Sequence, residues 1–227
     1  STYKPWGIIL FKRNIKSFTQ LKNLTKSIKK TIKDKNYPIL IDEEGGNVSR
    51  LSNLIDNKLF SQNFFGNLYY QNPNFTKRIY KKYIFSLSKI LNDLSITINT
   101  VPVLDLTYKK TNKIIGSRSY SQKIKIVKNL GKLCIQYFRE NKIFSVIKHI
   151  PGHGRATQDS HKYMPVINNN LKELLKSDFN CFINSKSFFA MTAHILYKKI
   201  DPQNVATFSK IMIKTIIRKK LKFRGIL

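Results

Sequence analysis

In the segment FSVIKHIPGHGRATQDSH (residues 144–161), a short apolar run changes abruptly into a polar, glycine-rich sequence. Residues 144–147 have the length and apolar character of a buried strand. The proline and glycines that follow do not suit a continuing helix, so we expect residues 148–161 to form a loop that leaves this strand. Three of the four histidines of the chain lie in that loop.

Working outward from this segment, short apolar runs recur along the chain and alternate with longer stretches of helical spacing. We predict further strands at residues 7–11, 38–41, 96–104, 188–193 and 225–227. Apolar residues with helical spacing occur between them, for example at residues 18–32, 130–137 and 211–221. Strands separated by helices are typical of βαβ units and of a parallel sheet.

The scarce acids and histidines fall where the apolar runs end. Asp42, Asp105 and His194 each come directly after a predicted strand. Polar groups gathered at the carboxyl ends of parallel strands are typical of the active face of a (β/α) barrel. A doubly wound sheet would place its ligand at the same ends, so this placement alone leaves both folds open.

Composition excludes several classes of protein. The chain has 227 residues, with 42 Lys and Arg against 12 Asp and Glu, a formal net charge of +30. A hydrophobic content of 41% excludes a mainly disordered chain. No run of about 18 apolar residues is present that could span a membrane. Cys134 and Cys181 lack CxxC spacing, which argues against a disulfide framework or zinc finger and favours a reducing compartment.

The positive charge has two interpretations. Cations clustered on one face and interleaved with aromatic residues would indicate a nucleic-acid-binding surface. The lysines instead recur along every stretch of helical spacing, which is typical of compositional drift over a solvated surface. We therefore expect no nucleic-acid partner. We also expect the helical stretch at 211–221 to pack outside a sheet, and not to lie on or insert into a membrane.

Asp159 and His161 are two residues apart, so in an extended loop their side chains lie on the same side. A carboxylate hydrogen-bonded to an imidazole fixes its tautomer and favours its protonated form. Such a pair can donate a proton and afterwards accept one. The alternative is a hydrogen bond that only braces the turn. In a loop that also holds Lys148 and His149, we favour catalysis.

A metal site is another interpretation of the same loop. His149, His153 and His161, together with Asp159, are suitable ligand types. Their spacing matches no standard metal signature, because a His-x-x-x-His pair helps only on a helix. We therefore expect neither a metal nor another cofactor.

A second polar loop, DEEGGNVSR (residues 42–50), follows another predicted strand. One carboxylate there can accept hydrogen bonds from a pair of sugar hydroxyls, and Arg50 can orient it. Glu43 and Glu44 have alternative interpretations as a solvated pair or as the start of a helix. Arg118 lies in a serine-rich turn and, taken alone, is more typical of a surface residue than of a ligand.

The loop at residues 148–161 resembles the signature Lys-His-Phe/Ile-Pro-Gly-His-Gly…Asp-Ser-His of bacterial β-N-acetylhexosaminidases in glycoside hydrolase family 3. Further segments resemble that family, in the family's order: residues 7–11, 41–46, 102–105, 116–120 and 191–194. The resemblance therefore covers nearly the whole chain. Its Asp-Ser-His element is the specific part, because related β-glucosidases of the wider family lack it.

The resemblance implies a single TIM-type (β/α) barrel catalytic domain over residues 1–227 and a retaining hydrolase that releases terminal β-linked N-acetylglucosamine. It also implies a muropeptide or another N-acetylglucosamine-containing glycan as partner in peptidoglycan recycling, a cytoplasmic location and a monomer at full length. His161 is then the general acid/base and Asp159 its partner. The implied sugar subsite comprises Asp42, Arg50, Arg118, Lys148 and His149.

Two features depart from the family pattern. The family's nucleophile is an Asp that follows a strand with the pattern Gly-x-x-x-Ser-Asp, whereas residues 223–227 read FRGIL, and none of the 12 acids fits that position. Our predicted strands are fewer than the eight of a closed barrel. We therefore expect a fragment, incomplete at both ends of the barrel and catalytically inactive. The alternatives are a metal-dependent barrel hydrolase and a non-catalytic sugar- or nucleic-acid-binding protein.

Overall fold

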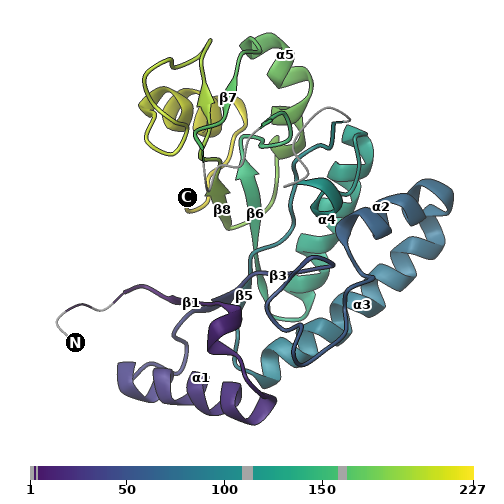
Figure 1. Cartoon of the computed structure of the whole chain (residues 1–227), viewed down its shortest axis with the longest axis vertical. Helices are drawn as coiled ribbons and strands as arrows, with labels where there is room; N and C mark the ends of the chain where they lie inside the picture. Colours follow the sequence, from purple (N-terminus) through teal and green to yellow (C-terminus); the bar gives the residue numbers. More distant parts are fainter. Residues whose placement is uncertain (1–2, 4, 109–114, 158–162) are drawn as a thin grey trace.

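The computed structural model describes residues 3, 5–108, 115–157 and 163–227. Its central element is a five-stranded sheet in which neighbouring strands are parallel (Figure 1). The strands follow in the order β1 (Ile8–Leu10), β2 (Ile39–Ile41), β5 (Ile98–Asn99), β6 (Phe144–Ile150) and β8 (Phe189–Thr192). This spatial order matches the chain order, so the sheet grows in one direction, as a barrel does. A doubly wound sheet grows outward from a central strand instead.

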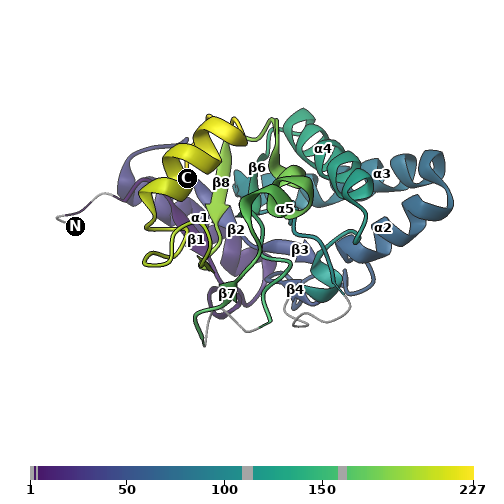
Figure 2. The ribbon, with the colours of Figure 1, turned by 90° about the horizontal axis from the view of Figure 1, so that it is seen from above.

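Helices connect successive strands and lie around the outside of the curled sheet (Figure 2). They are α1 (Phe18–Ile32), α2 (Gln62–Gln71), α3 (Pro73–Asp93), α4 (Ile124–Glu140), α5 (Leu171–Lys176) and the π-type helix η4 (Ile211–Lys220). Parallel strands require such crossover connections. The fold is an incomplete TIM-type (β/α) barrel, which confirms the predicted fold class and decides against the doubly wound alternative.

Short elements fill the connections at the strand ends. Three are 3₁₀ turns: η1 (Lys12–Asn14), η2 (Gly116–Arg118) and η3 (Asp178–Phe182). Two are small two-stranded sheets: the antiparallel pair β3 (Glu43–Gly45) with β4 (Val48–Ser49), and the parallel pair β7 (Val166–Ile167) with β9 (Leu196–Tyr197). The sequence did not predict these pairs, because strands of two or three residues are too short to show an apolar period.

Polar side chains begin several of the helices. Ser17 accepts a hydrogen bond from the backbone N–H of Gln20 at the start of α1. Ser61 and Asn72 do the same at the starts of α2 and α3. Pro73 occupies the first turn of α3, where its missing N–H costs no helical hydrogen bond. The local sequence therefore determines where these helices begin.

Five of the six predicted strands are confirmed, with changed bounds. The strand predicted at 96–104 is β5 and ends at Asn99, because the backbone N–H of Val101 turns back to the carbonyl oxygen of Asn99 at 2.9 Å. β6 continues to Ile150 through a register shift opposite β8. The stretch at 225–227 forms a single parallel bridge, between Ile226 and Phe189.

The predicted helical stretch at 211–221 is η4, and it packs inward. Met212, Ile216 and Ile217 are buried, while Lys219 and Lys220 in its last turn are exposed. This burial confirms a helix packed outside a sheet. None of the helices in the described part of the chain has the length and apolarity needed to cross a membrane.

Gln62, the first residue of α2, ties together two segments that border the polar strand ends. Its amide nitrogen donates to the carbonyl oxygens of Val103, at 2.9 Å, and Arg118, at 2.7 Å. Its own carbonyl accepts from the backbone N–H of Val103 at 2.9 Å. Gly66 allows α2 to approach closely, because a Cβ there would lie 1.7 Å from the carbonyl oxygen of Tyr120. The position of α2 therefore holds the turn that contains Arg118.

We expect Gly66→Ala to lower the free energy of unfolding by about 1–3 kcal/mol, because the added methyl group forces α2 away from Tyr120. The exposed control Lys77→Ala, on α3, should change it by less than about 0.5 kcal/mol. Urea unfolding followed by circular dichroism measures both. A Gly66→Ala variant as stable as the wild type would contradict this packing.

Candidate active site

Three neighbouring strands bring polar side chains together at one edge of the sheet. Asp42 follows β2, Thr100 follows β5, and Lys148 lies in β6. Nζ of Lys148 is 3.2 Å from Oδ1 of Asp42 and 3.0 Å from Oγ1 of Thr100. The Thr100 hydroxyl donates in turn to Asp42. The parallel ladder thus joins side chains that are 106 positions apart in the sequence.

Glu44, in β3, connects Lys148 to Arg118. Its Oε1 lies 2.6 Å from Nζ of Lys148. Arg118 donates to both oxygens of the same carboxylate, from Nε at 2.8 Å and from Nη2 at 2.9 Å. Such a two-pronged pair fixes the plane of the guanidinium as well as its position. Arg118 is therefore a half-buried, ion-paired member of the cluster and not an ordinary surface residue.

Glu43 and Glu44 are 1% and 4% exposed, so the interpretations as a solvated pair or as a helix start are both wrong. They lie in the β3–β4 hairpin, and two consecutive glycines make its turn. Gly45 and Gly46 have φ angles of +80° and +63°, in the left-handed region that favours glycine. This turn folds the hairpin back so that both carboxylates face inward.

Glu43 braces the segment that contains Arg50. It accepts hydrogen bonds from the Ser49 hydroxyl at 3.1 Å and from the backbone N–H of Leu51 at 2.8 Å, on either side of Arg50. Nη2 of Arg50 then reaches Oδ2 of Asp42 at 3.0 Å. Burial raises the pKa of Glu43, and these hydrogen bonds partly offset the effect.

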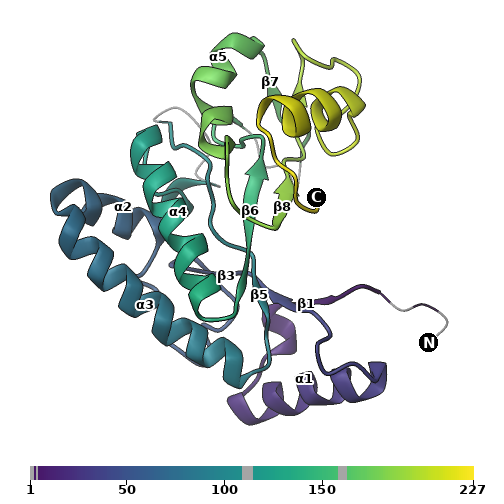
Figure 3. The ribbon, with the colours of Figure 1, turned by 180° about the vertical axis from the view of Figure 1, so that it is seen from behind.

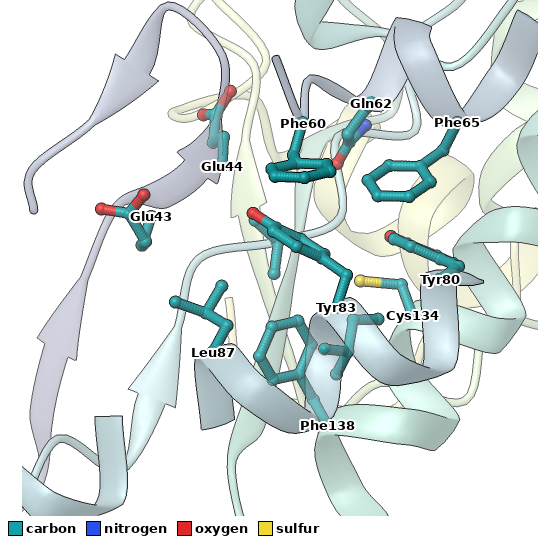
Figure 4. Close-up of a pocket in the computed structure, with 12 residues that line it drawn as sticks. Glu43, Glu44, Phe60, Gln62, Phe65, Tyr80, Tyr83, Leu87, Cys134 and Phe138 are labelled. Carbon is teal, nitrogen blue, oxygen red and sulfur yellow. The ribbon is translucent and has the colours of Figure 1, made fainter. Parts of the chain in front are cut away.

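Aromatic rings form an apolar wall beside the two glutamates (Figure 4). Phe60, Phe65 and Tyr83 pack with ring centroids 5.1 to 6.2 Å apart. The cavity between this wall and the hairpin has a volume of about 10 Å³, room for about one water molecule. An ionised carboxylate beside this apolar wall would destabilise the fold if it had no partner. The cations bound to Glu44 are therefore needed for stability.

The carboxylate of Asp105 fixes the position of His149. Its Oδ2 lies 2.7 Å from Nδ1 of the imidazole, and the carboxylate also accepts the backbone N–H groups of His149 and His153. Nε2 of His149 lies 3.5 Å from Nη2 of Arg118. With a carboxylate at Nδ1 and a guanidinium near Nε2, the neutral ring is expected to carry its proton on Nδ1.

Charges in this cluster balance. Three carboxylates (Asp42, Glu44 and Asp105) face three cations (Arg50, Arg118 and Lys148). Burial tends to raise the pKa of each acid, but the neighbouring cations, His149 and hydrogen bonds outweigh it, so all three pKa values are lowered. The pKa of Asp42 falls to about 2. The cluster therefore presents charged donors and acceptors in fixed positions, which suits a neutral ligand with several hydroxyl groups.

The described part of the polar loop is anchored to its surroundings. Arg155 donates from Nε to Asp178 at 2.6 Å, and Tyr197 donates to the carbonyl oxygen of Gly152 at 2.5 Å. His153 is 4% exposed, and burial lowers its pKa. The catalytic pair predicted at Asp159 and His161 lies outside the described residues, so those two assignments stay predictions.

Metal ligands do not gather in the described part of the chain. No group of three or more His, Cys, Asp or Glu side chains there is arranged to hold an ion. The rings of His149 and His153 are 5.4 Å apart, but Nδ1 of His149 is bound to Asp105. The metal interpretation also involves Asp159 and His161, which lie outside these residues.

The structure brings all five residues of the predicted sugar subsite into one cluster: Asp42, Arg50, Arg118, Lys148 and His149. Sequence analysis did not assign Glu44, Asp105 and Thr100 to this subsite. The positions of Glu44 and Asp105, shortly after the ends of predicted strands, could have placed both acids near the site. The position of Thr100 could not, because it falls inside the predicted strand at 96–104.

The lowered pKa of Asp42 predicts an acid-sensitive contribution to stability. The folded protein favours ionised Asp42, so the contribution is present above pH about 4 and is lost as the pH falls through about 2. As the pH falls through this range, the wild type should lose free energy of unfolding. The Asp42→Asn variant should lose about 2 kcal/mol less. Chemical denaturation at several pH values measures it. The exposed control Asp93→Asn should show the same pH dependence of the free energy of unfolding as the wild type. The same pH dependence in Asp42→Asn would contradict the lowered pKa of Asp42.

Comparison with known proteins matches the chain to one family. The model named Glycosyl hydrolase family 3 N terminal domain matches residues 3–227. A beta-hexosaminidase of Nitrosomonas eutropha is 30% identical over 222 residues, covering 96% of this chain and 63% of that protein. One from Haemophilus influenzae is 32% identical over 225 residues, covering 96% of this chain and 62% of that protein. The chain thus spans less than two thirds of the length of these relatives.

Solved structures agree with the match. NagZ from Neisseria gonorrhoeae in complex with N-trifluoroacetyl-D-glucosamine superimposes with a TM-score of 0.87 at 30% identity, covering 97% of this chain and 66% of that one. A β-N-acetylglucosaminidase from Thermotoga maritima has a TM-score of 0.78 at 26% identity, covering 96% of this chain and 44% of that one. The resemblance inferred from the sequence is confirmed at the level of the family. The chain belongs to glycosyl hydrolase family 3, and residues 3–227 match its N-terminal domain.

Proposed function

We propose that the protein is a retaining β-N-acetylhexosaminidase that removes terminal β-linked N-acetylglucosamine. The observation that carries this proposal is the charge-balanced cluster of Asp42, Glu44, Lys148 and Arg118 at the carboxyl ends of the strands. Ligands of (β/α) barrels bind at this end. Support also comes from relatives named beta-hexosaminidase and from the similar structure of NagZ in complex with N-trifluoroacetyl-D-glucosamine.

In this proposal the cluster forms the subsite for the terminal sugar. Asp42 accepts hydrogen bonds from hydroxyl groups, and Arg50, Arg118 and Lys148 donate to hydroxyl oxygens. Each of these side chains is already held by another, so little rotational freedom is lost when a sugar binds. His149, oriented by Asp105, completes the set. Sugar recognition thus depends on a prearranged network.

The proposed chemistry uses residues from the polar loop. His161, oriented by Asp159, donates a proton to the glycosidic oxygen while a carboxylate nucleophile attacks the anomeric carbon and the bond to the leaving group breaks. His161 then removes a proton from a water molecule, which attacks the glycosyl-enzyme and releases the sugar. We assign the nucleophile to none of the 12 acids of this chain. By the resemblance to the family, the nucleophile is proposed to be an Asp that follows a Gly-x-x-x-Ser segment.

We further propose muropeptide-type fragments of peptidoglycan as the substrate class, with a role in peptidoglycan recycling in the cytoplasm. The protein then acts as a monomer without a nucleic-acid partner. A metal-dependent hydrolase is the alternative, and a chelator separates the two, because the proposed reaction should be insensitive to it. The peptide part of the substrate can be tested by comparing turnover of muropeptides with turnover of simple N-acetylglucosaminides.

The placement of the nucleophile predicts a difference between two forms of the protein. The 227-residue chain should bind N-acetylglucosamine without hydrolysing a chromogenic N-acetylglucosaminide, whereas a form extended past Leu227 should hydrolyse it. In the extended form, His161→Ala should lower kcat/KM, which reports formation of the glycosyl-enzyme, by about 100-fold or more for a poor leaving group. The loss should be smaller for a dinitrophenyl group, which needs no proton to depart.

The control for this comparison is Lys172→Ala, an exposed change on α5, which should keep full activity. Equal turnover by the two forms would contradict the proposed nucleophile position. An equal loss for both leaving groups in His161→Ala would contradict the proton-donor role.

Arg118→Lys tests the sugar subsite while keeping the charge. A lysine cannot reproduce the two parallel hydrogen bonds to Glu44, so we expect affinity for N-acetylglucosamine to fall by about tenfold. The matched control, Arg78→Lys on the exposed side of α3, should leave affinity unchanged. Isothermal titration measures both, and unchanged affinity in Arg118→Lys would remove Arg118 from the subsite.

A further inference from the structure

A groove lies on the outer wall of the barrel, between α4 and the segment from η3 to β8. Its volume is about 360 Å³, within the range of small-molecule sites. α4 packs beside β6 and against η3, as the view from behind shows for α4 and β6 (Figure 3). None of the residues that line it belongs to the cluster around Lys148. The groove is therefore a separate feature of the fold.

Cations line this groove, and no acid does. Lys128, Lys132 and Arg139 come from α4, and Lys186 comes from the segment before β8. None of the four forms an ion pair with another residue in the described ranges. Nζ of Lys128 is oriented by a hydrogen bond of 3.1 Å to the side chain of Asn180. Glu140, next to Arg139 in the sequence, interacts with it electrostatically, but no described acid lies within ion-pairing distance of any of the four.

The inner surface of the groove is apolar, with one unsatisfied polar atom. Leu104 and Ile135 are buried there, at 2% and 8% exposure, and Ile183 adds to the same surface. Among the residues that the structure describes, the buried hydroxyl of Ser185 has no hydrogen-bond partner. A buried polar atom without a partner is uncommon and calls for one. The wall of the groove thus contains one buried polar atom without a described partner.

A cavity of about 10 Å³, room for about one water molecule, borders the groove toward the amino ends of the strands, so an apolar group there would have to lie on the surface rings. The two share Ile135, Arg139 and Lys186. The small cavity reaches Phe144 and Phe188, which are 44% and 56% exposed and pack edge to face at 5.6 Å. Exposed aromatic rings beside a basic groove provide a contact for an apolar group.

We propose that this groove binds a small anionic amphiphile, with a phosphate or carboxylate group at Lys128, Lys132 and Lys186 and an apolar body along Ile135 toward Phe188. Charge alone does not single out the groove, because the chain carries 42 cations. The groove differs from other basic surface because a cavity, an apolar floor and an unsatisfied hydroxyl coincide there. Both parts of the ligand are therefore required for binding.

Titration calorimetry with octyl phosphate tests the proposal. Inorganic phosphate and octanol test each half of the ligand separately, and octanoate tells whether a carboxylate replaces the phosphate. We expect octyl phosphate to bind at a single site and to be displaced by neither of its halves at equal concentration. N-acetylglucosamine should not displace it either, so the result is independent of the proposed enzymatic function.

The variant Lys132→Glu/Lys186→Glu should weaken octyl phosphate binding by about tenfold or more, because it reverses two charges on the groove. The control Lys77→Glu/Lys82→Glu makes the same change in net charge on exposed positions of α3 and should bind as the wild type does. Thermal unfolding checks that both variants fold. Equal binding by the two double variants would overturn the proposal, as would binding of octanol or inorganic phosphate as tight as that of octyl phosphate.

Discussion

The buried ammonium group of Lys148 is the constraint on which the candidate site depends. Lys148 is 2% exposed, and a lone charge so far from water would be strongly destabilising. It is compensated by Asp42 at 3.2 Å and Glu44 at 2.6 Å, and Arg118 balances the second carboxylate. Because each ion requires the next, the ends of β2 and β6 and the β3–β4 hairpin must keep one relative arrangement.

The barrel supplies this arrangement through its parallel ladder. β2, β5 and β6 are neighbours in the sheet, so their carboxyl ends meet at one edge. The Gly45-Gly46 turn then directs Glu44 inward, and Gln62 holds the turn that carries Arg118. The local turn geometry and the long-range strand pairing together position the side chains of the cluster. A network prearranged in this way is well suited to bind a neutral, hydroxyl-rich sugar through many fixed hydrogen bonds.

Sequence reasoning was most successful where the signal was local. Apolar runs that end in Asp42, Asp105 and Lys148-His149 predicted the strands and the edge where the polar groups gather. Burial of Glu43 and Glu44 was not predictable in this way, because it depends on Asn57, Ser49 and the distant Arg118 and Lys148. Thr100 was missed for a similar reason, since its role comes from the irregular chain around Pro102. The resemblance to family motifs supplied part of what local patterns could not, because it assigned Arg118 to the sugar subsite without knowledge of its contact with Glu44.

The central claim is that the ion cluster at the strand ends is the binding site for the terminal sugar. A crystal structure of the protein with bound N-acetylglucosamine tests it most directly. The account predicts sugar hydroxyls within hydrogen-bonding distance of Asp42, Lys148 and Arg118, with the side chains of the cluster nearly unmoved. A sugar bound elsewhere, or a cluster that must break its internal ion pairs to admit one, would contradict it.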